Sequence, residues 1–196
     1  GAYSPSRLIN KDLETKIINK IIKPTLKGLN ELNTKYKGFL YTGLMIVDDE
    51  PYLIEYNVRM GDPECQTILP LLKNDFVEVL KNCLSGTLEK INLEWKNEKS
   101  LCVVLTSKGY PDKFEKNILI ENLENLKIKE NEYIYHAGTK SEREKFYSTG
   151  GRVLNFVSLD KSFKVARDKA LYLIKTLNWK NGYHRNDIAF KVIDNL

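Results

Sequence analysis

The stretch that decides the fold runs from Leu53 to Gln66 and reads LIEYNVRMGDPECQ. It begins like a buried strand, yet Glu55, Asn57 and Arg59 place a carboxylate, an amide and a guanidinium at alternate positions. Successive side chains of a strand point to opposite faces, so the spacing predicts that these three share one face. The apolar residues between them are expected to face the core: Ile54, Tyr56 and Val58.

A face of this composition can bind a divalent cation. Glu55 and Asn57 offer oxygen ligands of the kind that magnesium takes at about 2 Å, often beside nucleotide phosphates and water. Arg59 would then pair with a phosphate or carboxylate of a substrate. Alternating polar residues are equally typical of an ordinary half-exposed antiparallel sheet. Asn is a poor strand residue, however, and the Gly-Asp-Pro-Glu corner that follows favours a positioned site.

Two more carboxylates, Asp62 and Glu64, lie in that corner. They would hold a substrate amino group or order the water of the metal. Alternatively, they cap the helix that follows through its dipole.

The overall composition indicates a globular chain. The 196 residues, 42% of them apolar, suffice for a core. Three widely spaced cysteines argue against a disulfide framework and a zinc site. With no long apolar run and no secretion signal, we expect a cytoplasmic protein without a membrane partner. Aromatic residues are not interleaved with Lys and Arg, so no nucleic-acid partner is expected despite the net charge of +5.

Periodicity predicts an α+β fold. In the first half we expect a helix over residues 10–37, capped by Asn10 or Asp12 and kinked at Pro24. A β-hairpin over 39–47 and 51–58 follows, and then a helix capped by Asn74 that Gly86 ends.

A polar stretch over 88–99 marks a boundary, so we predict domains over 1–95 and 96–196. The second domain should hold strands at 101–106, 133–136 and 152–159 and a helix over 160–177. The apolar stripe of that helix should be core. The tail over 183–196 is expected to be a strand or a short helix.

Four quoted stretches carry a family resemblance: GAYSP (1–5), GFLYTGLMIVDDEPYLIEYNVRMGDPECQTILPLL (38–72), HAGT (136–139) and TGGRVL (149–154). Along essentially its whole length, the chain resembles the C-terminal portion of phosphoribosylamine-glycine ligases, also called glycinamide ribonucleotide synthetases. The resemblance implies the second half of an ATP-grasp domain followed by a small α+β domain. The chain starts without a methionine, and the missing N-terminal part of the same enzyme would be a partner in the active site.

The resemblance also implies a reaction. Such enzymes use ATP to join glycine to 5-phosphoribosylamine through a glycyl phosphate. It assigns magnesium or manganese to Glu55 and Asn57, and the acyl phosphate or a substrate anion to Arg59. Met45 would lie against adenine or be plain core. Gly43 stands where many ATP-grasp enzymes carry another acidic ligand, so the ligand set is thin.

Weaker signals leave alternatives open. The opening residues with Ser4 are a substrate loop or a turn. The backbone of Thr149 to Arg152 cradles an anion or forms a hairpin turn. His136 and His184 are expected to be structural. Rival functions are another ATP-grasp ligase or carboxylase, and a basic module that binds nucleic acid.

Overall fold

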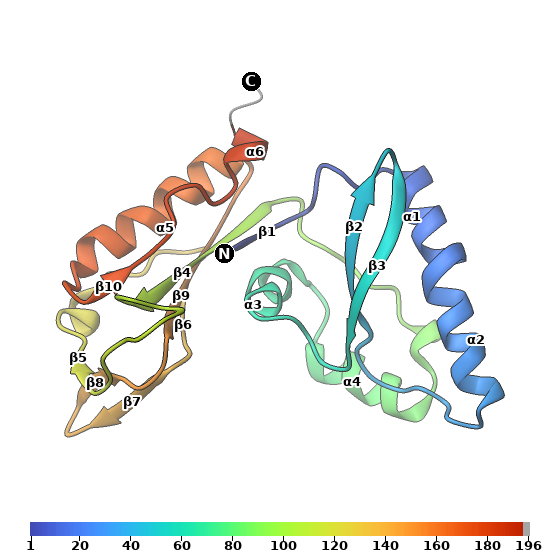
Figure 1. Cartoon of the computed structure of the whole chain (residues 1–196), viewed down its shortest axis with the longest axis horizontal. Helices are drawn as coiled ribbons and strands as arrows, with labels where there is room; N and C mark the ends of the chain where they lie inside the picture. Colours follow the sequence, from blue (N-terminus) through green and yellow to red (C-terminus); the bar gives the residue numbers. More distant parts are fainter. Residues whose placement is uncertain (194–196) are drawn as a thin grey trace. The chain divides into compact units, whose positions relative to one another are not determined.

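The computed structural model describes residues 1–193, which pack as two compact units (Figure 1). The hairpin unit consists of residues 6–62 and 72–95. The sheet unit consists of Gly1–Pro5, Pro63–Leu71 and the chain from Lys96 onward. The chain passes into the sheet unit for the last time after residue 95, and two earlier segments pack with that later part of the chain. The division into domains over 1–95 and 96–196 stays a prediction.

The hairpin unit begins with a helical run in three parts: α1 (Lys11–Ile17), the π-helical turn η1 (Ile18–Ile22) and α2 (Lys23–Glu31). The side chain of Asn10 caps α1 by accepting the Leu13 N–H at 2.8 Å, as one of the two predicted caps. Pro24 lies in the first turn of α2. Because proline has no N–H, the α-helical ladder cannot continue through it, and the wider π turn precedes it. The run ends at Glu31 and not at residue 37.

The predicted hairpin is confirmed. Strand β2 (Tyr41–Val47) pairs antiparallel with β3 (Glu50–Asn57). Asp48 and Asp49 form the turn with φ of 49° and 57°, the left-handed conformation that a two-residue turn of the I′ type requires.

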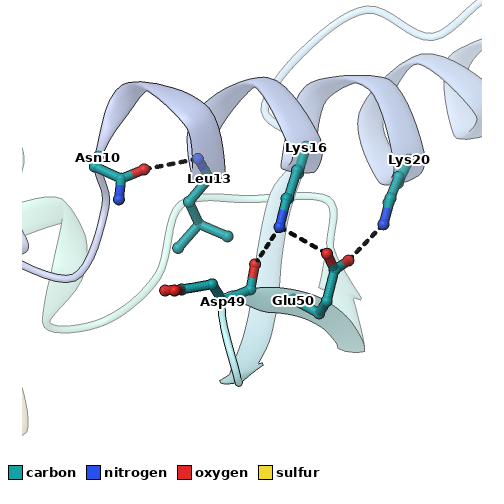
Figure 2. A network of polar contacts seen from close by, with 6 residues as sticks. All are labelled: Asn10, Leu13, Lys16, Lys20, Asp49 and Glu50. Atoms are coloured by element: carbon teal, nitrogen blue, oxygen red, sulfur yellow. Dashed lines mark hydrogen bonds and ion pairs between the residues drawn. The ribbon is translucent and has the colours of Figure 1, made fainter.

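A network of polar contacts ties this turn to the helical run (Figure 2). Lys16 Nζ donates to Glu50 Oε1 at 2.6 Å and to the Asp49 carbonyl at 2.9 Å. Lys20 bonds the second oxygen of Glu50. Hydrogen bonds from Lys16 and then Lys20 lower the pKa of Glu50 to about 2.

The predicted apolar back face of β3 is wrong. The register passes from Gly43 opposite Glu55 to Leu44 opposite Leu53, so Ile54 is the extra residue of a β-bulge. The bulge shifts the alternation of the strand, and Ile54 is 62% exposed. Val58 lies beyond the end of β3 and is 74% exposed. Only Tyr56 is half-buried, and its hydroxyl contacts Thr25.

Helix α4 (Phe76–Ser85) begins one residue later than predicted. The cap is Asp75, which accepts the N–H groups of Val77 and Glu78 at 2.8 and 3.3 Å. The predicted cap, Asn74, instead bonds the backbone of residues 92 and 94. Gly86 ends the helix with φ of 71°, as predicted. The short helix η3 (Leu88–Lys90) follows.

The sheet unit is built on an antiparallel sheet in the order β1 (Ala2–Ser4), β4 (Lys99–Ser107), β9 (Arg152–Asp160), β6 (Glu132–His136). Strand β10 (Gly182–Tyr183) also pairs with β4. The three predicted strands are confirmed within two residues. The opening segment, however, is neither a loop nor a turn, because β1 pairs with β4 from Ala2 opposite Cys102 to Ser4 opposite Ser100.

Helix α5 (Phe163–Leu177) packs along β4 and β9. Its predicted stripe is confirmed as core, since all of these residues are buried: Phe163, Ala166, Ala170, Leu173, Ile174 and Leu177. Helix α3 (Glu64–Ile68), the following turn η2 (Leu69–Leu71) and α6 (Phe190–Ile193) complete the packing. A smaller cluster on β4 and β9, which includes Cys102 and Val157, contains Leu71 of η2.

A second, small sheet consists of β5 (Ile118–Leu119), β8 (Lys145–Ser148) and β7 (Thr139–Glu142). The short helix η4 (Leu123–Asn125) lies between β5 and β6. Residues 149–151 connect β8 to β9 of the main sheet, so the hairpin turn expected there is wrong. The tail contains both a short strand, β10, and a short helix, α6, and residues 194–196 lie outside the described part.

Candidate metal and nucleotide site

Glu55 and Asn57 lie on one side of β3. The Asn57 Nδ2 group donates to Glu55 Oε1 at 3.0 Å, which requires both side chains to project together. Because the amide donates through its nitrogen, the Asn57 carbonyl oxygen keeps its capacity as a ligand. Glu55 is exposed and Asn57 is half-buried, so the pair is accessible from solvent.

Gly43 makes room for this pair. It lies directly opposite Glu55, and a Cβ added at Gly43 would meet Glu55 Cγ at 3.0 Å. Gly43, at the position where many ATP-grasp enzymes carry an acidic ligand, therefore leaves the space that the Glu55 side chain occupies.

Met45 is two residues from Gly43 on the regular strand β2, so it faces the same side. Beyond the bulge its partner is Tyr52. Both are well exposed, Met45 at 53% and Tyr52 at 58%. One face thus combines two oxygen ligands with a neighbouring apolar surface. Tyr52 was not predicted as a site residue, because its place on this face depends on the bulge.

The other predicted residues are not part of this row. Strand β3 ends at Asn57, and Arg59 lies in the following bend, where its Nη1 donates to the Met60 carbonyl at 2.9 Å. The strand face that was predicted to carry Glu55, Asn57 and Arg59 therefore carries only Glu55 and Asn57.

The acidic corner divides between the units. Asp62 is exposed in the hairpin unit, and Glu64 is the first residue of α3 in the sheet unit. Glu64 is in the first helical turn, where a carboxylate suits the dipole, but Pro63 holds the capping position. Ser4 is half-buried at the end of β1.

The expected anion cradle at Thr149 to Arg152 has no free amides at its start. The N–H groups of Thr149 and Gly150 both donate to the Gly138 carbonyl, at 2.7 and 3.3 Å. Nearby, His136 bonds Thr139 Oγ1 at 2.8 Å, and burial lowers its pKa. The amides of Thr149 and Gly150 and the imidazole of His136 are therefore engaged in contacts within the fold.

The donor set fits a divalent ion that is shared with phosphates. A carboxylate and an amide oxygen are hard ligands, and magnesium or manganese in nucleotide sites takes few protein groups. Within residues 1–193, no three His, Cys, Asp or Glu side chains come close enough to form a complete metal site. The protein groups present would therefore hold the ion only together with nucleotide phosphates and water.

Comparisons with known proteins agree with this geometry. Residues 1–65 match the model described as phosphoribosylglycinamide synthetase, ATP-grasp (A) domain. Residues 100–191 match the phosphoribosylglycinamide synthetase C domain.

Several relatives are similar over nearly the whole chain. A phosphoribosylamine-glycine ligase of Fusobacterium nucleatum is 41% identical over 96% of this chain and 45% of its own length. A chloroplastic one from Arabidopsis thaliana is 38% identical, over 98% of this chain and 37% of its own length. The crystal structure of the Thermotoga maritima phosphoribosylamine-glycine ligase superposes with a TM-score of 0.82 at 34% identity, covering 95% of this chain and 45% of that one.

The fold, the face on β2 and β3 and these matches define an ATP-grasp protein, which confirms the predicted fold class. The chain belongs to the phosphoribosylglycinamide synthetase family, as its resemblance implied. It spans 45% of the length of the Fusobacterium nucleatum relative and of the Thermotoga maritima structure. Across the described residues, no helix has the length and apolar character needed to cross a membrane.

Proposed function

We propose that the chain is the C-terminal part of an enzyme that ligates glycine to 5-phosphoribosylamine with ATP. The terminal phosphoryl group of ATP passes to the glycine carboxylate, giving glycyl phosphate and ADP. The amine then attacks the acyl carbon, the C–O bond to phosphate breaks, and glycinamide ribonucleotide, phosphate and a proton are released. The relatives named phosphoribosylamine-glycine ligase support this substrate pair.

Within that reaction, Glu55 and Asn57 would hold magnesium or manganese against the ATP phosphates. Met45 and Tyr52 would contact the adenine. Arg59, Asp62, Glu64 and Ser4 remain candidates for the acyl phosphate and the substrates, as expected from the sequence. Phosphoryl transfer depends on positioning and charge neutralisation, so none of these side chains has to act as a nucleophile.

The single observation that carries the proposal is the Asn57 to Glu55 hydrogen bond on an exposed face opposite Gly43. The relatives are more than twice as long as the matched region, which supports an active site completed by the missing N-terminal part. The expected cytoplasmic location belongs to the same proposal, and fractionation of cells that express the tagged full-length protein would test it.

The test uses the full-length enzyme with Glu55→Gln, which removes one anionic oxygen and keeps the shape. We expect kcat for glycine-dependent phosphate release to fall at least about a hundredfold, because the metal ligand acts on developing charge. The matched control is Glu89→Gln, in the exposed helix η3, which should leave kcat unchanged.

An unchanged kcat in Glu55→Gln would contradict the assignment of Glu55 as a metal ligand. Phosphate release that depends on bicarbonate or another acid, and not on glycine with phosphoribosylamine, would favour a different ATP-grasp ligase or carboxylase.

A further inference from the structure

The sheet unit contains a pocket of about 450 Å³ that no part of the proposed metal site uses. All of its lining residues belong to this unit, and they combine two arginines, Arg152 and Arg185, with aromatic and apolar walls. Its size lies within the range of small-molecule sites. Among the described residues that line it there is no Asp or Glu.

The first wall is fixed where β4 ends and β9 begins. Arg152 is the register partner of Thr106. The Ser107 N–H donates to the Gly151 carbonyl at 2.7 Å, and Ser107 Oγ donates to the Gly150 carbonyl at 2.9 Å. These bonds hold the loop that carries Tyr110 against the start of β9.

Gly151 is required at this wall. A Cβ there would lie 2.2 Å from Tyr110 Cδ2, so the ring of Tyr110 packs directly on the glycine backbone. The Gly150 N–H is already bonded to the Gly138 carbonyl, and Gly151 leaves room for the Tyr110 ring. Tyr110 and Arg152 both line the pocket.

The second wall follows β10. Tyr183 is the register partner of Thr106, and Thr106 Oγ1 donates to its carbonyl at 3.0 Å. Two residues further, Arg185 donates from Nε and Nη2 to the carboxylate of Asp187 at 2.9 and 2.6 Å. This pair fixes the plane of the guanidinium and leaves three of its five N–H groups for another acceptor.

We propose that this pocket binds a small sugar phosphate, with Arg152 and Arg185 on the phosphate and Tyr110 and Tyr183 against the sugar. Planar guanidinium groups match phosphate oxygens geometrically. The aromatic and apolar walls cover the C–H faces of a sugar, while Thr106 and His184 supply polar groups for its hydroxyls. Burial lowers the pKa of His184, opposed by a side-chain hydrogen bond with Asn186, so the neutral imidazole prevails near pH 7 and keeps one ring nitrogen for a sugar hydroxyl. The choice of a sugar phosphate rests on the proposed function, whose amine substrate is one.

The test titrates ribose 5-phosphate into this chain by isothermal titration calorimetry, without ATP or divalent metal. Ribose and inorganic phosphate are titrated in parallel. We expect ribose 5-phosphate to bind to the parent chain, and Arg152→Ala and Arg185→Ala each to weaken its affinity at least about tenfold. The affinity of Arg152→Lys should lie between those of the parent chain and Arg152→Ala, because lysine keeps the positive charge but loses the bidentate geometry of the guanidinium. The control Arg143→Ala changes an exposed arginine in the turn between β7 and β8 and should bind as the parent chain does.

The proposal fails if folded parent chain does not bind ribose 5-phosphate at millimolar concentration, if both arginine variants bind it unchanged, or if inorganic phosphate binds as tightly. Thermal melting checks that each variant is folded. If Arg152→Ala unfolds, the more exposed Arg185→Ala decides alone. The assay needs neither nucleotide nor metal, so its outcome is independent of the Glu55→Gln kinetics that test the proposed function.

Discussion

The hairpin unit and the sheet unit bury their hydrophobic side chains to very different extents. In the described part of the hairpin unit, the side chains of Leu13 and Ile21 are buried, while Ile54 and Tyr52 are more than half exposed. The sheet unit has a continuous core between α5 and the main sheet, in which Phe156 is fully buried. The candidate metal site therefore lies on the unit with little core of its own. Local interactions stabilise the hairpin unit: the Asn10 cap, the two-residue turn and the Glu50 network.

The largest expected effect breaks the core of the sheet unit. Phe156→Ala should lower the free energy of unfolding of that unit by about 3 to 5 kcal/mol, because it removes a fully buried ring and leaves a cavity. Ile54→Ala should lower the free energy of unfolding of the hairpin unit by less than about 0.5 kcal/mol, because its side chain is mostly exposed. Urea denaturation is followed by Trp179 fluorescence in a Trp95→Phe background for the sheet unit, and by Trp95 fluorescence in a Trp179→Phe background for the hairpin unit. Equal losses in the two variants would refute the contrast.

An intermediate effect separates function from stability in the hairpin unit. Gly43→Ala puts a Cβ 3.0 Å from Glu55 Cγ and should displace that side chain. In the full-length enzyme we expect Mn²⁺ affinity in the presence of ATP to fall by about three- to tenfold, as a ligand is moved and not removed. Electron paramagnetic resonance of free Mn²⁺ measures it.

Gly28→Ala adds the same methyl group to α2 with no atom within 4 Å. It should keep the Mn²⁺ affinity and stabilise the helix by about 0.5 to 1 kcal/mol. Equal Mn²⁺ affinities in the two glycine variants would contradict the role given to Gly43.

The smallest expected effect concerns the Glu50 network. The pKa of Glu50 is lowered from 4.5 to about 2 by Lys16 and then Lys20, so its stabilising effect is complete above pH 4.5. That contribution should be lost as the pH falls from 4.5 towards 2. Glu50→Gln should therefore flatten the dependence of the melting temperature on pH in this window. Because the pair is exposed, 0.5 M NaCl should weaken the effect in the parent chain. If the melting temperature of the parent chain and of Glu50→Gln depended on pH in the same way, Glu50 would not be one of the interactions that stabilise the hairpin unit.

Elements with a strong local signal were predictable from the sequence. The stripe of α5, the β2 and β3 hairpin and the apolar strands β4 and β9 follow from periodicity and turn chemistry, and the structure confirms them. The common face of Glu55 and Asn57 was predictable for the same reason, since two alternate positions of one strand share a face, and their role as metal ligands stays a prediction.

Features that depend on distant partners were not predictable. The bulge at Ile54 is a property of the register with β2, and β1 is a strand only because it pairs with Cys102 and its neighbours far along the chain. The turn at Arg143 and Glu144 has positive φ without Gly or Asn to signal it. Asn74 and Asp75 are both good caps, and only the contacts of Asn74 with residues 92 and 94 decide between them. The pocket beside Arg152 gathers residues from β4, β9 and the segment after β10, which no local pattern links.

The pairing of β1 with β4 has a practical consequence for dividing the gene. The polypeptide passes between the two units four times, after residues 5, 62, 71 and 95. A protein expressed from Lys96 onward would lack β1 and α3, and the N–H and C=O groups of Ser100 and Cys102 along that margin of β4 would be left to water or to a foreign strand. Such a truncated protein is expected to self-associate through this strand edge. A stable sheet unit therefore requires its three separate chain segments and cannot be obtained as one continuous stretch of the sequence.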